Sequence, residues 1–154
     1  MTEVTRSLAA RYYTDPQVVK LETDGLLART WQFGCHASEL AKTGDYATFE
    51  IAGESLFAIR GRDDNIRVFY NVCQHRAHQL VSGTGTTRVV VCPYHAWTYE
   101  LTGELRAGPN INAVEGFDKS GICLTEVRAE QFVGFVFVNL DPDAAPMEDW
   151  FPKA

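Results

Sequence analysis

Two stretches decide the fold of this chain: Asn71-Val72-Cys73-Gln74-His75-Arg76 and Cys92-Pro93-Tyr94-His95-Ala96-Trp97. The first contains a C-x-H pair and the second a C-x-x-H pair, with sixteen residues (76–91) between them. Each pair supplies one thiol and one imidazole, so the four side chains can be divided between two metal ions. The motif therefore predicts a metal centre with four ligands: Cys73, His75, Cys92 and His95.

The order of these ligands distinguishes two kinds of metal centre. In a [2Fe-2S] cluster with mixed ligands, two Cys bind one iron and two His bind the other. A structural zinc site also uses two Cys and two His, but its pairs are usually C-x2–4-C and H-x3–5-H. The mixed pairs therefore favour the iron–sulfur cluster, and a zinc-stabilised interaction module is the less favoured alternative. With neutral imidazoles the oxidised cluster carries no net charge, which makes it easier to reduce than a cluster with four thiolates.

The composition indicates one globular domain. The chain has 154 residues, 45% of them hydrophobic and 22% charged, and its net charge of −6 argues against a nucleic-acid partner. An acidic surface suits a partner with a basic patch but does not single one out. We find no apolar run of about 18 residues and no signal-peptide pattern at the start, and we therefore predict a cytoplasmic chain with no membrane span. In that compartment the four Cys serve as ligands or core residues rather than as disulfides.

The hydrophobic pattern predicts a helical arm followed by a mainly β domain. Thr14-Asp15-Pro16-Gln17 resembles a helix start with Thr14 as the cap, and an apolar stripe extends to about Arg29. From Trp31 onward the period changes to two, as in antiparallel strands. We predict three segments: an arm at 1–30, a β domain at 31–142 and a tail at 143–154. The expected strands include residues 46–51, 56–60, 66–70, 88–91, 98–101 and 135–140.

Other residues near the motif have two interpretations each. Trp97 can cover the metal centre or simply belong to the core. Tyr99 can donate a hydrogen bond to a ligand sulfur or only pack on a strand. His78 is more plausible at the surface than as a fifth ligand, Cys35-His36 has no partner motif, and Cys123 resembles a small apolar strand residue.

These residues resemble the N-terminal Rieske domain of the α subunit of Rieske non-haem iron oxygenases, which include ring-hydroxylating and quaternary-amine-demethylating enzymes. The resemblance covers nearly the whole chain. One departure is Ala96, where the family usually has Gly. The matching segments are Ala10–Pro16, Thr30-Trp31, Asn71–Arg76 and Cys92–Tyr99.

The resemblance implies a Rieske-type antiparallel β-sandwich with a small cluster-binding subdomain, preceded by the helical arm. It also implies an oxidoreductase, a monooxygenase or dioxygenase, that receives electrons from a reductase or ferredoxin. In the full-length protein they would reach a mononuclear non-haem Fe(II) in the catalytic domain of the same or a neighbouring subunit of a homo-oligomer.

That second iron needs two further His at close spacing, and only His36 and His78 remain. We therefore expect this chain to carry electron transfer alone, without catalytic residues. A stand-alone Rieske ferredoxin serving a separate oxygenase is the alternative, and the helical arm argues against it.

Overall fold

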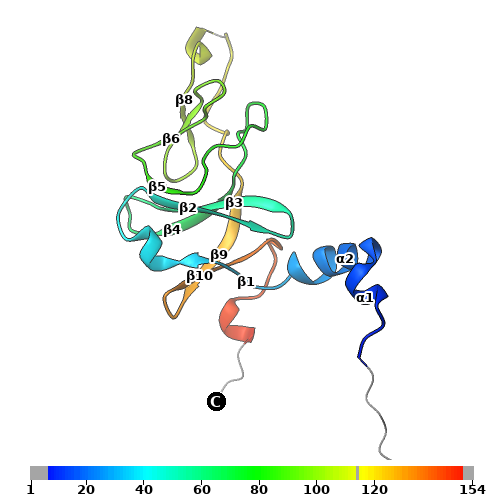
Figure 1. Ribbon diagram of the computed structural model, residues 1–154. Coiled ribbons are helices and arrows are strands. Elements are labelled where there is room, and N and C mark those ends of the chain that lie inside the picture. The colour runs from blue at the N-terminus through cyan, green and yellow to red at the C-terminus, as the bar shows by residue number, and fades with distance from the viewer. Residues whose placement is uncertain (1–6, 114, 151–154) are drawn as a thin grey trace, which may run out of the picture.

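The computed structural model describes residues 7–113 and 115–150, and its regular structure is mainly antiparallel strands. Residues 1–6 of the predicted arm and 151–154 of the predicted tail lie outside the described residues. The prediction of a mainly β domain with a helical arm is confirmed (Figure 1). The strands are β1 (Gln32–His36), β2 (Asp45–Ile51), β3 (Glu54–Arg60), β4 (Ile66–Tyr70), β5 (Thr84–Thr86), β6 (Val90–Val91), β7 (Thr98–Tyr99), β8 (Leu105–Ala107), β9 (Glu126–Phe132) and β10 (Phe135–Asn139).

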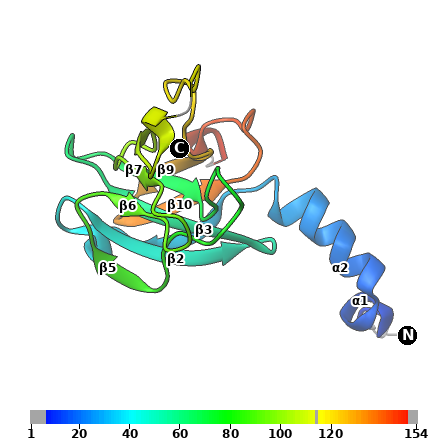
Figure 2. The same cartoon turned by 90° about the horizontal axis from the view of Figure 1, so that it is seen from above.

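The arm consists of α1 (Arg11–Thr14), α2 (Pro16–Glu22) and a π-helical turn, η1 (Thr23–Leu27). It projects from the body of the molecule, and none of the residues in these three elements is buried (Figure 2). The prediction that Thr14 caps the helix was wrong. Asp15 is the cap, and its carboxylate accepts a hydrogen bond from the Gln17 N–H at 2.9 Å, because Thr14 still belongs to α1 and its hydroxyl donates to the Ala10 carbonyl.

Seven strands form one curled antiparallel sheet in the order β1-β10-β9-β4-β3-β2-β5. β9 pairs with both β10 and β4, so it joins the two halves of the curl. The halves enclose what we call the sheet core. Its buried members are Cys35, Leu40, Ala47, Leu56, Ala58, Val68, Val127, Val136 and Val138.

A second core, the loop core, lies on the other face of β3 and β4. The three-stranded sheet β6-β7-β8 stands over this face (Figure 1). Alternate residues of β3 serve the two cores, because successive side chains of a strand point to opposite faces. Leu56 and Ala58 enter the sheet core, whereas Phe57 and Ile59 enter the loop core. The loop core contains Phe57, Ile59, Phe69, Cys73, Leu80, Val90, Cys92, Tyr99, Leu101, Leu105 and Leu124.

The predicted strands agree with the structure best where the apolar pattern is strongest. Residues 46–51, 56–60, 66–70 and 135–140 correspond to β2, β3, β4 and β10, whereas 88–91 and 98–101 shorten to two residues each in β6 and β7. The expected apolar environment of Cys123 was wrong. This residue is exposed and forms only an isolated bridge with Glu104.

The short 3-10 helices complete the fold: η2 (Ala37–Leu40), η3 (Ile111–Ala113) and η4 (Met147–Trp150). The segment around η4 returns to the sheet. The Met147 N–H donates to the Glu130 carboxylate at 3.1 Å, and the Trp31 indole N–H donates to the Ala145 carbonyl at 3.2 Å. In the described part of the chain, no helix has the length and apolar character needed to cross a membrane.

Candidate metal centre

Two loops of six residues carry the predicted ligands, and both close in the same way. In the first ligand loop (residues 73–78), the Cys73 N–H donates to the His78 carbonyl and the Ala77 N–H donates to the Cys73 carbonyl, both at 2.9 Å. In the second ligand loop (residues 92–97), the Cys92 N–H donates to the Trp97 carbonyl at 2.8 Å and the Ala96 N–H donates to the Cys92 carbonyl at 3.0 Å. Each Cys is therefore fixed at the base of a closed turn.

The fifth residue of each ligand loop has left-handed backbone geometry. The φ angles of Ala77 and Ala96 are 52° and 54°, a region that costs a residue with a Cβ about 1–2 kcal/mol. Ala96, where the resembling family has Gly, thus keeps the backbone of a glycine. The loops differ in one respect, because the imidazole comes two residues after the first Cys and three residues after the second.

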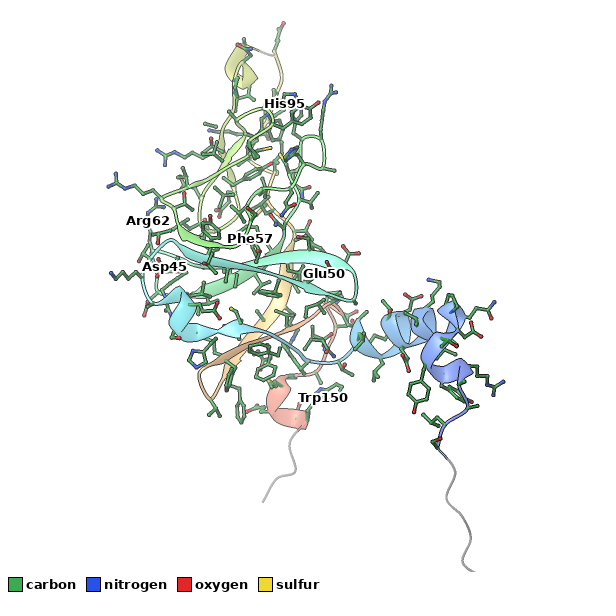
Figure 3. The ribbon with its side chains drawn as sticks, in the orientation of Figure 1. Asp45, Glu50, Phe57, Arg62, His95 and Trp150 are labelled. Carbon is green, nitrogen blue, oxygen red and sulfur yellow. The ribbon has the colours of Figure 1, made fainter. Side chains whose placement is uncertain are left out.

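The thiols lie inside the loop core, and the imidazoles face outward. Cys73 and Cys92 are only 3% and 2% exposed. Both lie close enough to the Tyr99 hydroxyl to raise its pKa. The rings of His75 and His95 lie side by side with centroids 4.8 Å apart. His75 is exposed and His95 is half-buried. Figure 3 shows His95 at the end of the molecule opposite Trp150.

This arrangement suits a centre with two metal ions. Within residues 7–113 and 115–150, no three His, Cys, Asp or Glu side chains gather as ligands for a single ion. The four motif residues instead provide two buried thiols and two adjacent imidazoles. Partial loss of water, together with His75 and Arg76 nearby, lowers the pKa of His95 and favours the neutral ring that binds metals.

Tyr99, two residues beyond the second ligand loop, contacts the first ligand loop. It lies on β7, is fully buried, and its hydroxyl oxygen is 3.2 Å from the Cys73 sulfur. The same oxygen accepts a hydrogen bond from the Gln74 N–H at 3.1 Å, so the hydroxyl proton is available to the sulfur. Burial is the main reason that the pKa of Tyr99 is raised, which keeps the hydroxyl protonated. Of the two interpretations of Tyr99, the structure favours the hydrogen bond.

Asn71 holds the chain on either side of the first ligand loop. This buried carboxamide accepts hydrogen bonds from the Leu80 and Val81 N–H groups, both at 3.1 Å, and donates to the Val81 carbonyl at 2.8 Å. Its backbone N–H also donates to the Ser55 carbonyl at 2.8 Å. The Asn71 side chain therefore makes the hydrogen bonds to Leu80 and Val81 that a neighbouring strand would make in a sheet. Sequence reasoning missed this role, although an Asn two residues before the first Cys was a visible signal.

Aromatic rings surround the imidazoles. Trp97 stacks on His75 with centroids 4.7 Å apart and planes 12° from parallel, and Tyr94 lies over His95 at 3.7 Å and 30°. An open pocket of about 550 Å³ adjoins both imidazoles and is lined further by Pro109, Ile111 and Phe117. Trp97 thus covers part of the candidate site and is not a member of the fully buried core.

The remaining predicted residues make other contacts. His78 is exposed, its Nδ1 is 2.6 Å from the Gln79 carbonyl, and its ring lies 5.4 Å from that of Tyr94, so its role at the surface stays a prediction. Cys35 lies in the sheet core, where burial raises the pKa of its thiol to about 11. His36 caps η2 by accepting a hydrogen bond from the Ser38 N–H. Neither residue belongs to the candidate centre.

Comparison with protein-family models matches residues 30–118 to the family described as Rieske [2Fe-2S] domain. Among curated proteins, the carnitine monooxygenase oxygenase subunit of Escherichia coli (strain K12) is 46% identical over 147 residues, which cover 95% of this chain and 39% of that protein. The large oxygenase component of the naphthalene 1,2-dioxygenase system of Pseudomonas aeruginosa is 34% identical over 144 residues, which cover 91% of this chain and 32% of that protein.

Solved structures give a similar result. A quaternary ammonium Rieske monooxygenase, whose structure is described in terms of carnitine oxidation and inter-subunit electron transfer, superposes with a TM-score of 0.85 at 44% identity. The match covers 90% of this chain and 38% of that one. The chain therefore spans about one-third to two-fifths of the length of these proteins.

The hydrogen bonds of Asn71 generate a test of how the first ligand loop is held. Replacing Asn71→Leu keeps the number and branching of the side-chain heavy atoms but leaves the Leu80 and Val81 N–H groups without partners. We expect the free energy of unfolding to fall by roughly 3 kcal/mol, because each unsatisfied buried group costs about 1–3 kcal/mol. Denaturant titration measures the change. The control Asn65→Ala lies in an exposed turn and should cost less than about 1 kcal/mol; equal losses in the two variants would contradict the role of Asn71.

Proposed function

This chain belongs to the Rieske [2Fe-2S] domain family, and we propose that it is the electron-transfer portion of an oxygenase α subunit. The observation that carries the proposal is the pairing of two buried thiols with two outward imidazoles on equivalent loops. The match to oxygenase subunits covers 95% of the chain and thus includes most of the helical arm, which supports an oxygenase over a stand-alone ferredoxin.

We propose that Cys73 and Cys92 hold the inner iron and that His75 and His95 hold the outer iron. Both thiols lie in one core and both imidazoles lie in contact above it, as two separate ligand pairs require. When bound, the cluster supplies one-electron chemistry. The buried side chains of the loop core shield the inner pair from water, whereas the imidazoles bring the redox centre to the surface.

The activity of a longer protein containing this chain is also part of the proposal. Identity to the carnitine monooxygenase subunit is 46%, against 34% to the naphthalene dioxygenase component. This difference favours oxygenation of a quaternary ammonium substrate at a mononuclear non-haem iron outside these 154 residues. The partners would be a reductase or ferredoxin as donor and a catalytic domain as acceptor, in the same or a neighbouring subunit of a homo-oligomer in the cytoplasm.

The metal content of the purified chain tests the proposed function. We expect about two irons and two acid-labile sulfides per chain, with the EPR signal of a mixed-ligand [2Fe-2S] cluster after reduction. Replacing His75→Ala or His95→Ala should abolish this signal, whereas the control His78→Ala should retain it, because His78 lies outside the pairing. A colourless protein that contains zinc and no sulfide would disprove the proposal.

The hydroxyl of Tyr99 should raise the reduction potential. A hydrogen bond to a ligand sulfur partly offsets its negative charge and therefore favours the added electron. Because the Gln74 N–H already occupies the hydroxyl oxygen, the Tyr99 proton points to the Cys73 thiolate as its acceptor.

We expect Tyr99→Phe to lower the midpoint potential by tens of millivolts, on the scale of about 40 mV for each kcal/mol of a lost hydrogen bond. A redox titration followed by circular dichroism or EPR measures it. The matched control is Tyr46→Phe, since Tyr46 packs against the same loop core without a bond to a ligand. Equal potentials in wild type and Tyr99→Phe would refute the effect.

The charge distribution indicates the kind of electron donor. Residues 71–99, which include both ligand loops, contain Arg76 and Arg88 but none of the 20 Asp and Glu residues of the chain. Arg76 is exposed, lies close enough to lower the pKa of His95, and forms no ion pair with any described residue. The two ligand loops therefore carry positive charge in a chain of net charge −6, whereas Glu115 and Asp118 flank Phe117 of the pocket wall. This pattern favours a donor with an acidic docking surface.

Ionic strength tests the sign of this local charge on the cluster-loaded chain. We expect reduction by dithionite, an anion, to slow as salt increases, and reduction by the cationic methyl viologen radical to accelerate. Arg76→Gln should slow the dithionite reaction roughly twofold or more at low salt. The control Arg29→Gln should have no effect, because Arg29 lies beside Leu140 and Asp141 and not at either ligand loop. If the net charge of −6 governs instead, the salt dependence will have the opposite sign.

A further inference from the structure

Trp97 lies between an imidazole of the first ligand loop and the segment that follows β8. Its indole stacks on His75 at 4.7 Å between centroids, and the edge of Phe117 meets it at 6.2 Å with planes 75° apart. The backbone of Gly108 also approaches closely, since a Cβ built on Gly108 would be 2.8 Å from Cδ1 of Trp97 and 3.0 Å from Nε1. The position of the indole is therefore restricted by two residues outside both ligand loops, Gly108 and Phe117.

The contact crosses from one ligand loop to the other. Trp97 ends the second ligand loop, where its carbonyl accepts the hydrogen bond of the Cys92 N–H, yet its ring covers His75 of the first. Tyr94, by contrast, contacts its own neighbour His95 and is 56% exposed. Both imidazoles thus have an aromatic partner. Trp97, the partner of His75, has the backbone of Gly108 packed against it.

A fixed ring partner can control how an imidazole ligand behaves. A His bound to a metal through one nitrogen can still rotate about that bond unless other contacts define its plane. A nearly parallel indole favours a single orientation and excludes water from the face that it covers. Gly108 in turn limits the positions open to the indole, because any larger residue there would meet it below ordinary contact distance.

We propose that Trp97 is a positioning residue that fixes the plane of the His75 ring, and that Gly108 is required because it leaves space for the indole. The inference rests on the proposed function, since it takes His75 as a ligand of the outer iron. It assigns Gly108 and Phe117 to the site, although neither residue supplies one of the four ligands.

Four variants of the cluster-loaded chain test the proposal. Trp97→Leu removes the stacking partner, Trp97→Phe keeps a flat ring, and Gly108→Ala displaces the indole without altering it. The control Phe135→Leu changes an aromatic residue that is 38% exposed and packs against Phe33, away from the ligand loops. The measurements are the EPR spectrum of the reduced protein, the midpoint potential, the iron and sulfide content, and the melting temperature.

We expect Trp97→Leu and Gly108→Ala to broaden and shift the EPR lines, because the His75 ring samples more orientations. We also expect both to raise the midpoint potential, because water admitted beside His75 stabilises the added negative charge. Trp97→Phe should remain close to wild type. Phe135→Leu should leave the spectrum and potential unchanged even if it lowers the melting temperature.

The outcomes separate this inference from the proposed function. A wild-type chain without iron and sulfide overturns both. A loaded wild type whose Gly108→Ala and Trp97→Leu variants keep its spectrum and potential overturns only the role of Trp97. If Trp97→Leu fails to fold, Gly108→Ala decides: a changed spectrum with full cluster content supports positioning, and an unchanged spectrum overturns it.

Discussion

The structure depends on the burial of Cys73 and Cys92 in a core that they share with the central strands. Phe57 and Ile59 of β3 enter the same loop core, so the ligand loops cannot shift without opening one face of the main sheet. Burying a large apolar side chain contributes about 1.5–3 kcal/mol, whereas each left-handed alanine in the loops costs about 1–2 kcal/mol. The packing therefore outweighs the strain of the two tight loops. Because the thiols anchor the loops from inside, the imidazoles are free to face outward.

The two ligand loops differ in charge from the rest of the chain. A carboxylate beside the imidazoles would compete as a ligand and would disfavour the added electron, and the stretch from residue 71 to residue 99 contains none. The acidic residues behind the net charge of −6 lie outside this stretch, so the net charge describes the whole chain but not the two ligand loops. An aromatic border formed by Tyr94 and Trp97 further limits the access of water to the imidazoles. Local composition is therefore the better guide to the partner.

Sequence patterns predicted the fold where one face of an element is consistently apolar. The run from Leu56 to Ile59 is buried on both faces and was recognised as a strand, whereas β9 was missed because its outward positions are charged and Val127 is its one buried residue. The helix cap was misplaced by one residue, since both Thr14 and Asp15 are suitable cap residues and only the end of α1 distinguishes them. Cys123 was misjudged because a short isolated bridge has no periodic signal.

The sequence by itself determined the ligand set proposed here, its division into two mixed pairs and the mainly β class, because ligand type and spacing are chemical properties that do not depend on packing. Only the tertiary structure decided which groups act on those ligands. The Tyr99 hydroxyl reaches Cys73 across 26 positions of sequence, and the Trp97 indole covers an imidazole of the opposite loop. Gly108 approaches that indole from a third segment. Such contacts arise from how the loops pack on β3 and β4, and no local pattern in the sequence specifies them.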